Sequence, residues 1–191
     1  MRRTYRLPGP SAMSGMVSLW GQSSLIESVQ YGSFTISNGN LTATATITEV
    51  DTTRSTLDFL GSSSTDTTGS PGRGLPSIIL TNGTTITGTR TLTTGDAVVA
   101  FCVVQYRPGV LKSVQRGTLF FNVSPTTTAT VTEVNTAKTQ VVDTGVRADT
   151  NGFQNALHAN RLTLTNGTTI TGTLAYATPS SYFGYEAREF Y

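Results

Sequence analysis

The sequence predicts an all-β protein of two tandem, duplicated β-sandwich modules, jelly-roll-like in type, preceded by an extended N-terminal arm. The string LTNGTTITGT begins at Leu80 and again 84 residues later at Leu164, which indicates a duplicated unit. Apolar and polar residues alternate with the period of a β-strand, and no stretch longer than two turns shows convincing helical periodicity. Turn residues separate about six strand-like runs per repeat, which is typical of sandwiches and barrels.

The repeat divides the 191 residues into three parts. Residues 1–24 form the arm, because the run Pro8-Gly9-Pro10 supports neither a helix nor a strand ladder. Residues 25–106 form the first module and residues 107–191 the second, with Arg107, Pro108 and Gly109 as a turn between them.

Each module opens on a strand whose apolar parity changes at a glycine. Val29 and Tyr31 share one parity, whereas Phe34 and Ile36 take the other, and Gly32 lies between them. The second copy changes parity in the same way around its own glycine. We therefore expect a glycine bulge in both opening strands.

The next strand, at residues 41–47, alternates without a break. Leu41, Ala43, Ala45 and Ile47 fall on one face and the intervening threonines on the other. This pattern predicts a strand with one buried face.

An Asn-Gly pair lies between two strand-like runs in each repeat. Asn-Gly tolerates the positive φ angles of a type I′ turn, so Asn82-Gly83 predicts a tight hairpin in which Leu80 faces Ile86. In the second copy Asn166-Gly167 predicts the same pairing of Leu164 with Ile170.

The last strand differs most between the copies. One parity is apolar in both and is assigned to the core: Val99, Phe101 and Val103 in the first copy, and Phe183, Tyr185 and Ala187 in the second. The other parity holds Val98, Ala100, Cys102 and Val104 in the first copy, but Tyr182, Gly184, Glu186 and Arg188 in the second. The first copy's strand should therefore be covered on both faces, and the second should be half-exposed to solvent. The cover is either the second module or the arm, or it is another subunit.

Two segments are candidates for recognition. The first is the arm, whose assembly contacts we assign to Arg2, Arg3, Tyr5, Arg6 and Trp20. The alternative is an arm that lies on its own body. The second is the loop that carries Arg147, Asp149, Phe153 and His158, since long loops on a rigid β scaffold commonly mediate recognition. The alternative is a mobile surface loop.

The residues give little sign of catalytic chemistry. His158 is the sole histidine and has no carboxylate or thiol neighbour in sequence, and Cys102 is the sole cysteine, so no internal disulfide can form. Glu49 and Glu133 occupy equivalent positions, and we interpret them as structural. We expect no enzyme activity, no metal and no cofactor.

The composition excludes further classes. Only 13% of the residues are charged and the net charge is +2, so the chain does not look like a nucleic-acid-binding or membrane protein. Residues 12–20 lack the apolar run of a secretory signal, which favours synthesis in a cytoplasm.

Three motifs together resemble a β module of tailed-bacteriophage structural proteins, which often occurs in tandem. They are the opening Ser-Val-Gln-x-Gly, a Thr-Ala-Thr strand, and the Leu-Thr-Asn hairpin. The first runs from Ser28 to Gly32 and from Ser113 to Gly117, and the resemblance covers about residues 26–191. The second copy departs from the pattern between residues 141 and 161.

The resemblance implies a non-enzymatic virion protein, made in the host cytoplasm. We expect a subunit of a tail or collar appendage of the fibre type, anchored by its N-terminal arm. Its partners would be neck, tail or capsid subunits and further copies of itself. One alternative is a capsid decoration (cement) protein, and another is a carbohydrate-binding adhesin module that contacts a host surface glycan.

Overall fold

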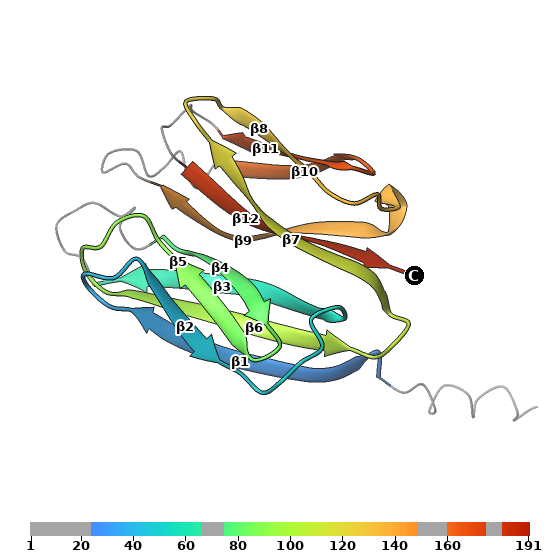
Figure 1. Ribbon diagram of the computed structural model, residues 1–191, viewed down its shortest axis with the longest axis horizontal. Helices are drawn as coiled ribbons and strands as arrows, with labels where there is room; N and C mark the ends of the chain where they lie inside the picture. The colour runs from blue at the N-terminus through green and yellow to red at the C-terminus, as the bar shows by residue number, and fades with distance from the viewer. Residues whose placement is uncertain (1–23, 66–74, 149–159, 175–180) are drawn as a thin grey trace, which may run out of the picture.

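The computed structural model describes residues 24–65, 75–148, 160–174 and 181–191 (Figure 1). In these residues the protein is all-β, with twelve strands and one short 3-10 turn, η4 (Thr136–Lys138). The first half contains β1 (Ile26–Ile36), β2 (Thr42–Thr46), β3 (Ser55–Ser64), β4 (Ser77–Asn82), β5 (Thr85–Thr89) and β6 (Ala97–Tyr106). The second half contains β7 (Leu111–Phe121), β8 (Thr126–Thr130), β9 (Thr139–Ala148), β10 (Asn160–Asn166), β11 (Thr169–Leu174) and β12 (Ser181–Phe190). No helix in the described part is long and apolar enough to cross a membrane.

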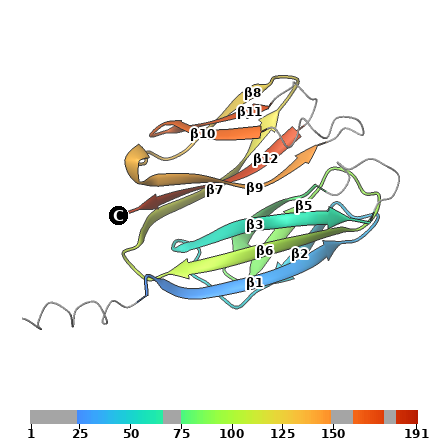
Figure 2. The ribbon, with the colours of Figure 1, turned by 180° about the vertical axis from the view of Figure 1, so that it is seen from behind.

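The strands form two antiparallel layers in each half, and the halves lie one above the other (Figures 1 and 2). In the first half one layer has the order β1-β6-β3 and the other β2-β5-β4. In the second half the corresponding orders are β7-β12-β9 and β8-β11-β10. A single pairing between β4 and β9 makes β2-β5-β4-β9-β12-β7 a continuous six-stranded sheet.

Each half encloses its own apolar core. The parity assigned to the core in the last strands is confirmed, because these side chains are buried: Val99, Phe101, Val103, Phe183, Tyr185 and Ala187. Strand β2 follows its predicted alternation, with Ala43 and Ala45 packed on the core and its threonines exposed. Each core therefore fills the space between two sheets, as in a β-sandwich.

The expected glycine bulges are wrong. Strand β1 pairs with β6 without interruption from Ser28 to Ile36, so Gly32 occupies an ordinary inward position opposite Phe101. A Cβ at Gly32 would overlap the Phe101 ring, and a Cβ at Gly117 would overlap the Tyr185 ring in the same way. The glycine makes room for an aromatic ring, and Val29 and Tyr31 simply lie on the outer face.

The hairpin pairing is confirmed, but the turn type is not. Leu80 faces Ile86, and Leu164 faces Ile170. Gly83 does not have the positive φ that a type I′ turn requires. A Cβ there would collide with the carbonyl oxygen of Val50, whose N–H donates to the Gly83 carbonyl at 2.8 Å. Close backbone approach, not φ, is what demands glycine at this turn.

The glutamine of the Ser-Val-Gln-x-Gly motif ties the two sheets of each half together. The Gln30 amide accepts from the Thr48 N–H at 2.8 Å and donates to the Thr48 carbonyl at 2.9 Å. Gln115 makes the same pair of bonds to Thr132, at 2.6 and 2.9 Å. The side-chain amide acts as a substitute peptide group, so the motif has an architectural role in both halves.

We predict that Gln30→Glu lowers the free energy of unfolding by about 0.5–1.5 kcal/mol. A carboxylate can still accept from the Thr48 N–H, but it cannot donate to the Thr48 carbonyl. Urea denaturation followed by circular dichroism measures the change. Gln115→Glu should cost a similar amount, and a stability equal to that of the wild type in both variants would contradict the role given to the amide.

Candidate functional site

A densely bonded and buried polar cluster lies where the two halves meet. Glu186 and Arg188 point outward from β12, and Arg116 lies beside them on β7. The Glu186 carboxylate bonds Arg116 Nε at 2.7 Å and Arg188 Nε at 3.0 Å. Only 1% of Glu186 and 5% of Arg188 is exposed. This face of the β7-β12-β9 sheet, named the junction face, is therefore a buried ionic surface.

The junction face binds the outer edge of strand β3. Strand β3 ends its sheet, so the backbone groups of alternate residues point away from β6 without a strand to pair with. The Leu57 N–H donates to Glu186 Oε2 at 3.0 Å, and the Leu57 carbonyl accepts from Arg188 Nη2 at 2.8 Å. Two charged side chains thus take the place of a neighbouring strand.

Further bonds extend this contact along β3. Arg116 donates to the carbonyls of Ser55 and Thr52, at 2.5 and 3.1 Å, and Arg188 donates to Asp58 Oδ1 at 2.7 Å. Residues 55–57 are fully buried. Residues 55–58 are named the junction edge. Each buried charge at this contact has an oppositely charged or carbonyl partner, which is the condition for burying charge at low cost.

At the rim of the junction, Gly145 leaves room for the backbone of the first half. Gly145 has a φ of +107° and pairs with Ser77 at the start of β4. A Cβ at Gly145 would overlap the Pro76 carbonyl. The close backbone approach that joins β4 to β9 therefore depends on glycine.

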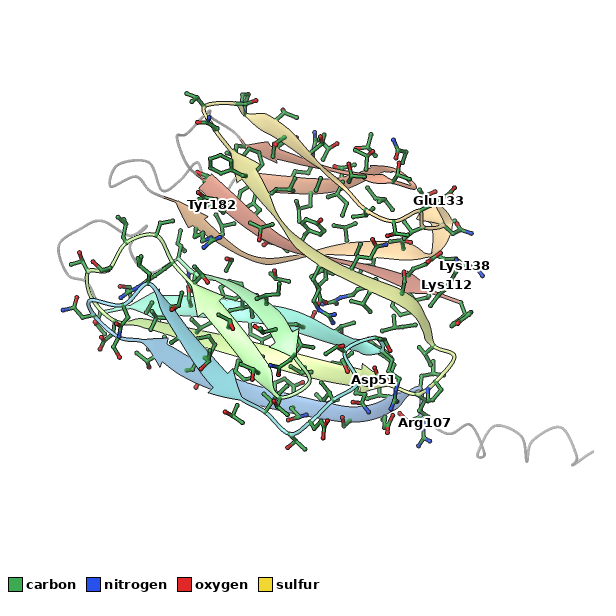
Figure 3. All side chains as sticks on the ribbon, in the orientation of Figure 1. Asp51, Arg107, Lys112, Glu133, Lys138 and Tyr182 are labelled. Atoms are coloured by element: carbon green, nitrogen blue, oxygen red, sulfur yellow. The ribbon has the colours of Figure 1, made fainter. Side chains whose placement is uncertain are left out.

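A second cluster lies at the start of β12, where Figure 3 labels Tyr182. The Tyr182 ring stacks with Phe120 at a centroid distance of 4.8 Å, and the Arg147 guanidinium lies 4.5 Å from its centre. Arg147 and Tyr182 line a cleft of about 420 Å³, whose other wall is formed by residues of the first half that include Thr42 and Arg90. Arg147 Nε has no hydrogen-bond partner in the described part of the chain, and burial lowers the pKa of Arg147.

A third cluster joins β7 and β12 at the other end of the second half. Lys112, Glu133 and Lys138 lie together there in Figure 3. The buried Glu189 carboxylate accepts from Lys112 Nζ at 2.8 Å and from the Asn135 N–H at 2.9 Å. These bonds, the one to Lys112 first, lower the pKa of Glu189 below its usual value of 4.5.

The lowered pKa of Glu189 predicts a loss of stability in acid. A carboxyl whose pKa is lower in the folded state stabilises the fold above the unfolded pKa, and that contribution is lost as the pH falls through the folded pKa. The free energy of unfolding should therefore fall as the pH is lowered below about 4.5. Urea denaturation at a series of pH values measures this fall.

Glu189→Gln is the matched variant for this prediction. It should reduce the dependence on pH but not abolish it, because hydrogen bonds also lower the pKa values of Glu27 and Asp51. An identical pH dependence in the variant and the wild type would contradict the role of Glu189.

The residues predicted from sequence do not form one site. The arm residues Arg2, Arg3, Tyr5, Arg6 and Trp20 lie outside the described residues, as do Asp149, Phe153 and His158. Arg147, predicted to lie in a loop, is instead on strand β9 and lines the cleft. Arg54 of the first half pairs with Asp51 and Glu27.

One expectation about the last strands is wrong, and another is narrowed to the arm or another subunit. Glu186 and Arg188 were expected to face solvent, but they are buried in the junction because the edge of β3 lies on them. Val98 is 37% exposed and Ala100 and Val104 are half-buried, so the second half does not cover that face, although Cys102 within it is buried. Sequence reasoning missed Arg116 altogether and missed the burial of Glu186 and Arg188, because no pattern in the sequence identified a contact with β3.

The described residues contain no group of three or more His, Cys, Asp or Glu side chains that could hold a metal ion. The buried Glu186 carboxylate accepts hydrogen bonds from two guanidinium groups and a backbone N–H. The chemistry of this site is that of joining surfaces. No protein-family model, no curated protein and no solved structure matches the chain.

Proposed function

We propose that the chain is a tandem duplication of one β-sandwich module and serves as a non-enzymatic structural protein of a tailed-bacteriophage virion. In this proposal residues 25–106 and 107–191 are the two modules, and residues 1–24 are an arm that anchors the protein in a tail or collar appendage. Its neighbours are neck, tail or capsid subunits.

The observation that carries the proposal is the use of the repeated residues for architecture. Besides the bonds of Gln30 and Gln115, the Asp51 N–H donates to the Gln105 side chain at 2.9 Å. At the equivalent place in the second half, the Asn135 N–H donates to Glu189 at 2.9 Å. The motifs that resemble the phage module therefore hold strands in place, as expected of a building block.

Mass spectrometry of purified virions of the phage that encodes the chain tests this proposal. We expect the protein in the particle at a copy number of a few dozen or fewer, as for neck and tail proteins. A copy number in the hundreds would instead support the alternative of a head decoration protein, and absence from the particle would overturn both.

Deletion of residues 1–24 tests the anchoring role. We expect the truncated protein to give the circular dichroism spectrum of a folded β protein but to be lost from particles, because the strands described here bond to one another. A variant with Ile79→Ser, which changes one exposed side chain of β4, is the control that should enter particles normally. Normal incorporation of the truncated protein would contradict the anchoring role.

A carbohydrate-binding module is the second candidate. Aromatic side chains that bind sugars must offer an open ring face. Phe120 is 44% exposed beside the cleft of Arg147, which favours this candidate, whereas Phe183 and Tyr185 are buried and Tyr182 already contacts Phe120 and Arg147. A glycan array probed with wild type and Phe120→Ala tests it, and signals that the substitution does not reduce would exclude this surface.

A further inference from the structure

The junction within the chain consists of two unlike surfaces, a face on the second half and an edge on the first. Because the pairing order of the strands recurs, each surface has a counterpart on the other half. The burial of these two counterparts can be compared directly with that of the contact that is made.

The counterpart of the junction face is the outer face of the β1-β6-β3 sheet, named the open face. Tyr31, Cys102 and Val104 stand there at the positions of Arg116, Glu186 and Arg188. Figure 2 looks onto this sheet, and no other strand lies in front of it. Tyr31 is 75% exposed, and further exposed apolar residues on the three strands of this sheet are Val29, Leu60 and Val98.

The counterpart of the junction edge is formed by residues 139–142 of β9, named the open edge. Ser55, Thr56 and Leu57 of the junction edge are fully buried. At the equivalent positions Thr139 and Val141 are half-buried and Gln140 is exposed. The chain therefore buries the junction face and the junction edge but covers their counterparts only in part: on the open face Cys102 is buried, Val104 is half-buried and Tyr31 is exposed.

Two equivalent glycines differ in the same way, one beside a neighbouring backbone and the other beside empty space. Gly61 of β3 corresponds to Gly145 of β9, and both have positive φ angles, +117° and +107°. The space beside Gly145 is filled by Pro76 and Ser77, but nothing lies within 4 Å of a Cβ at Gly61. The first half thus keeps the backbone shape that admits a neighbour, with no neighbour present among the described residues.

The open face and the open edge both have an apolar residue where the junction has a charged one. At the junction Arg188 of the face meets Asp58 of the edge. At the equivalent positions the open face has Val104 and the open edge has Val142. A charged pair at the used contact is thus matched by an apolar pair at the unused one, so the two open surfaces suit each other.

We propose that the open face binds the open edge of a second copy of this chain and repeats between chains the contact made within one. Such a contact is heterologous, because it joins two different surfaces, so it propagates head to tail into a ring or a filament. The inference does not rest on a virion role. If the protein self-associates but is absent from virions, this inference stands and the proposed function fails. If the protein is present in virions but monomeric, the proposed function stands and this inference fails.

Disulfide cross-linking tests the register of this contact. Arg116 contacts the Ser55 carbonyl, so Tyr31 of one copy should lie against Thr139 of the next. In a Cys102→Ala background, the double variant Tyr31→Cys, Thr139→Cys should form a ladder of disulfide-linked multimers under mild oxidation. The matched control Tyr31→Cys, Thr44→Cys places the second cysteine on exposed β2 and should give none. The absence of a ladder, an equal ladder in the control, or dimers from Tyr31→Cys alone would overturn the proposal.

Sedimentation analysis of the full chain tests the open face separately. The wild type should increase in mass with concentration, and Tyr31→Lys should weaken this self-association by about tenfold or more, because a charge would be buried in an apolar contact. Ile79→Lys adds the same charge at an exposed residue of β4 and should associate as the wild type does. Equal weakening by both variants, or none by Tyr31→Lys, would contradict the proposal.

Discussion

Replacement of Glu186 with alanine is expected to lower the free energy of unfolding by about 3–5 kcal/mol, because it leaves Arg116 without a counter-charge and Arg188 with Asp58 alone. The Glu186 carboxylate bonds Arg116, Arg188 and the N–H of Leu57. Without it, two guanidinium groups remain close together in a water-poor junction. Breaking such a network by removing one member costs more than the network contributes as a whole.

Urea denaturation followed by circular dichroism measures this loss. Glu133→Ala, which removes an exposed carboxylate of the same half, is the control and should change the free energy of unfolding by less than about 0.5 kcal/mol. The double variant Glu186→Ala, Arg188→Ala should cost less than the sum of the two single variants, because the two side chains bond each other and the second change removes one of the two guanidinium groups that the first left close together. A loss below about 1 kcal/mol for Glu186→Ala would contradict the account of the junction.

The all-β fold, the hairpin pairings and the core parity of β6 and β12 could be predicted because they depend on local alternation. A period of two places Val99 and Phe101 on one face whatever lies beyond the sheet. The facing of Leu80 and Ile86 similarly follows from a short connection between two strands. These features require only contacts between residues close in sequence or along one strand.

The junction could not be predicted because polarity does not report burial. Glu186 and Arg188 alternate with core residues, as a solvent-exposed face does, but they meet Leu57 and Asp58 about 130 residues earlier in the chain. Nothing in a one-dimensional pattern identifies an edge strand that will lie across a sheet. The converse holds for Val98 and Val104, whose apolar character predicted cover that the second half does not supply.

The glycines were misread for a related reason. A parity change at Gly32 suggested a bulge, but the apolar residues before it are on the open face and those after it are in the core. The strand is regular, and the apparent change of phase comes from a surface that is apolar although it is exposed. An exposed apolar face of this kind is uncommon on a monomer, which is why the open face points to an interface.

Gly145→Ala is expected to cost at least about 1 kcal/mol more than Gly61→Ala, the equivalent change in the first half. Both residues have positive φ, so an alanine at either position adds backbone strain of about 1–3 kcal/mol. Only at Gly145 would the new methyl group also collide with the backbone of Pro76 and Ser77. The collision must push β4 away from β9 and disturb the junction next to it.

Urea denaturation of both variants in dilute solution separates the two effects, since the strain is common to them and the collision is not. In Gly145→Ala the halves should also part more readily, which limited proteolysis can detect as earlier release of one half. Equal losses in the two variants would mean that β4 moves aside without cost. The joining of the halves would then depend on the charges of β12 and β7 alone, and the space beside Gly61 would no longer indicate a place for a neighbouring chain.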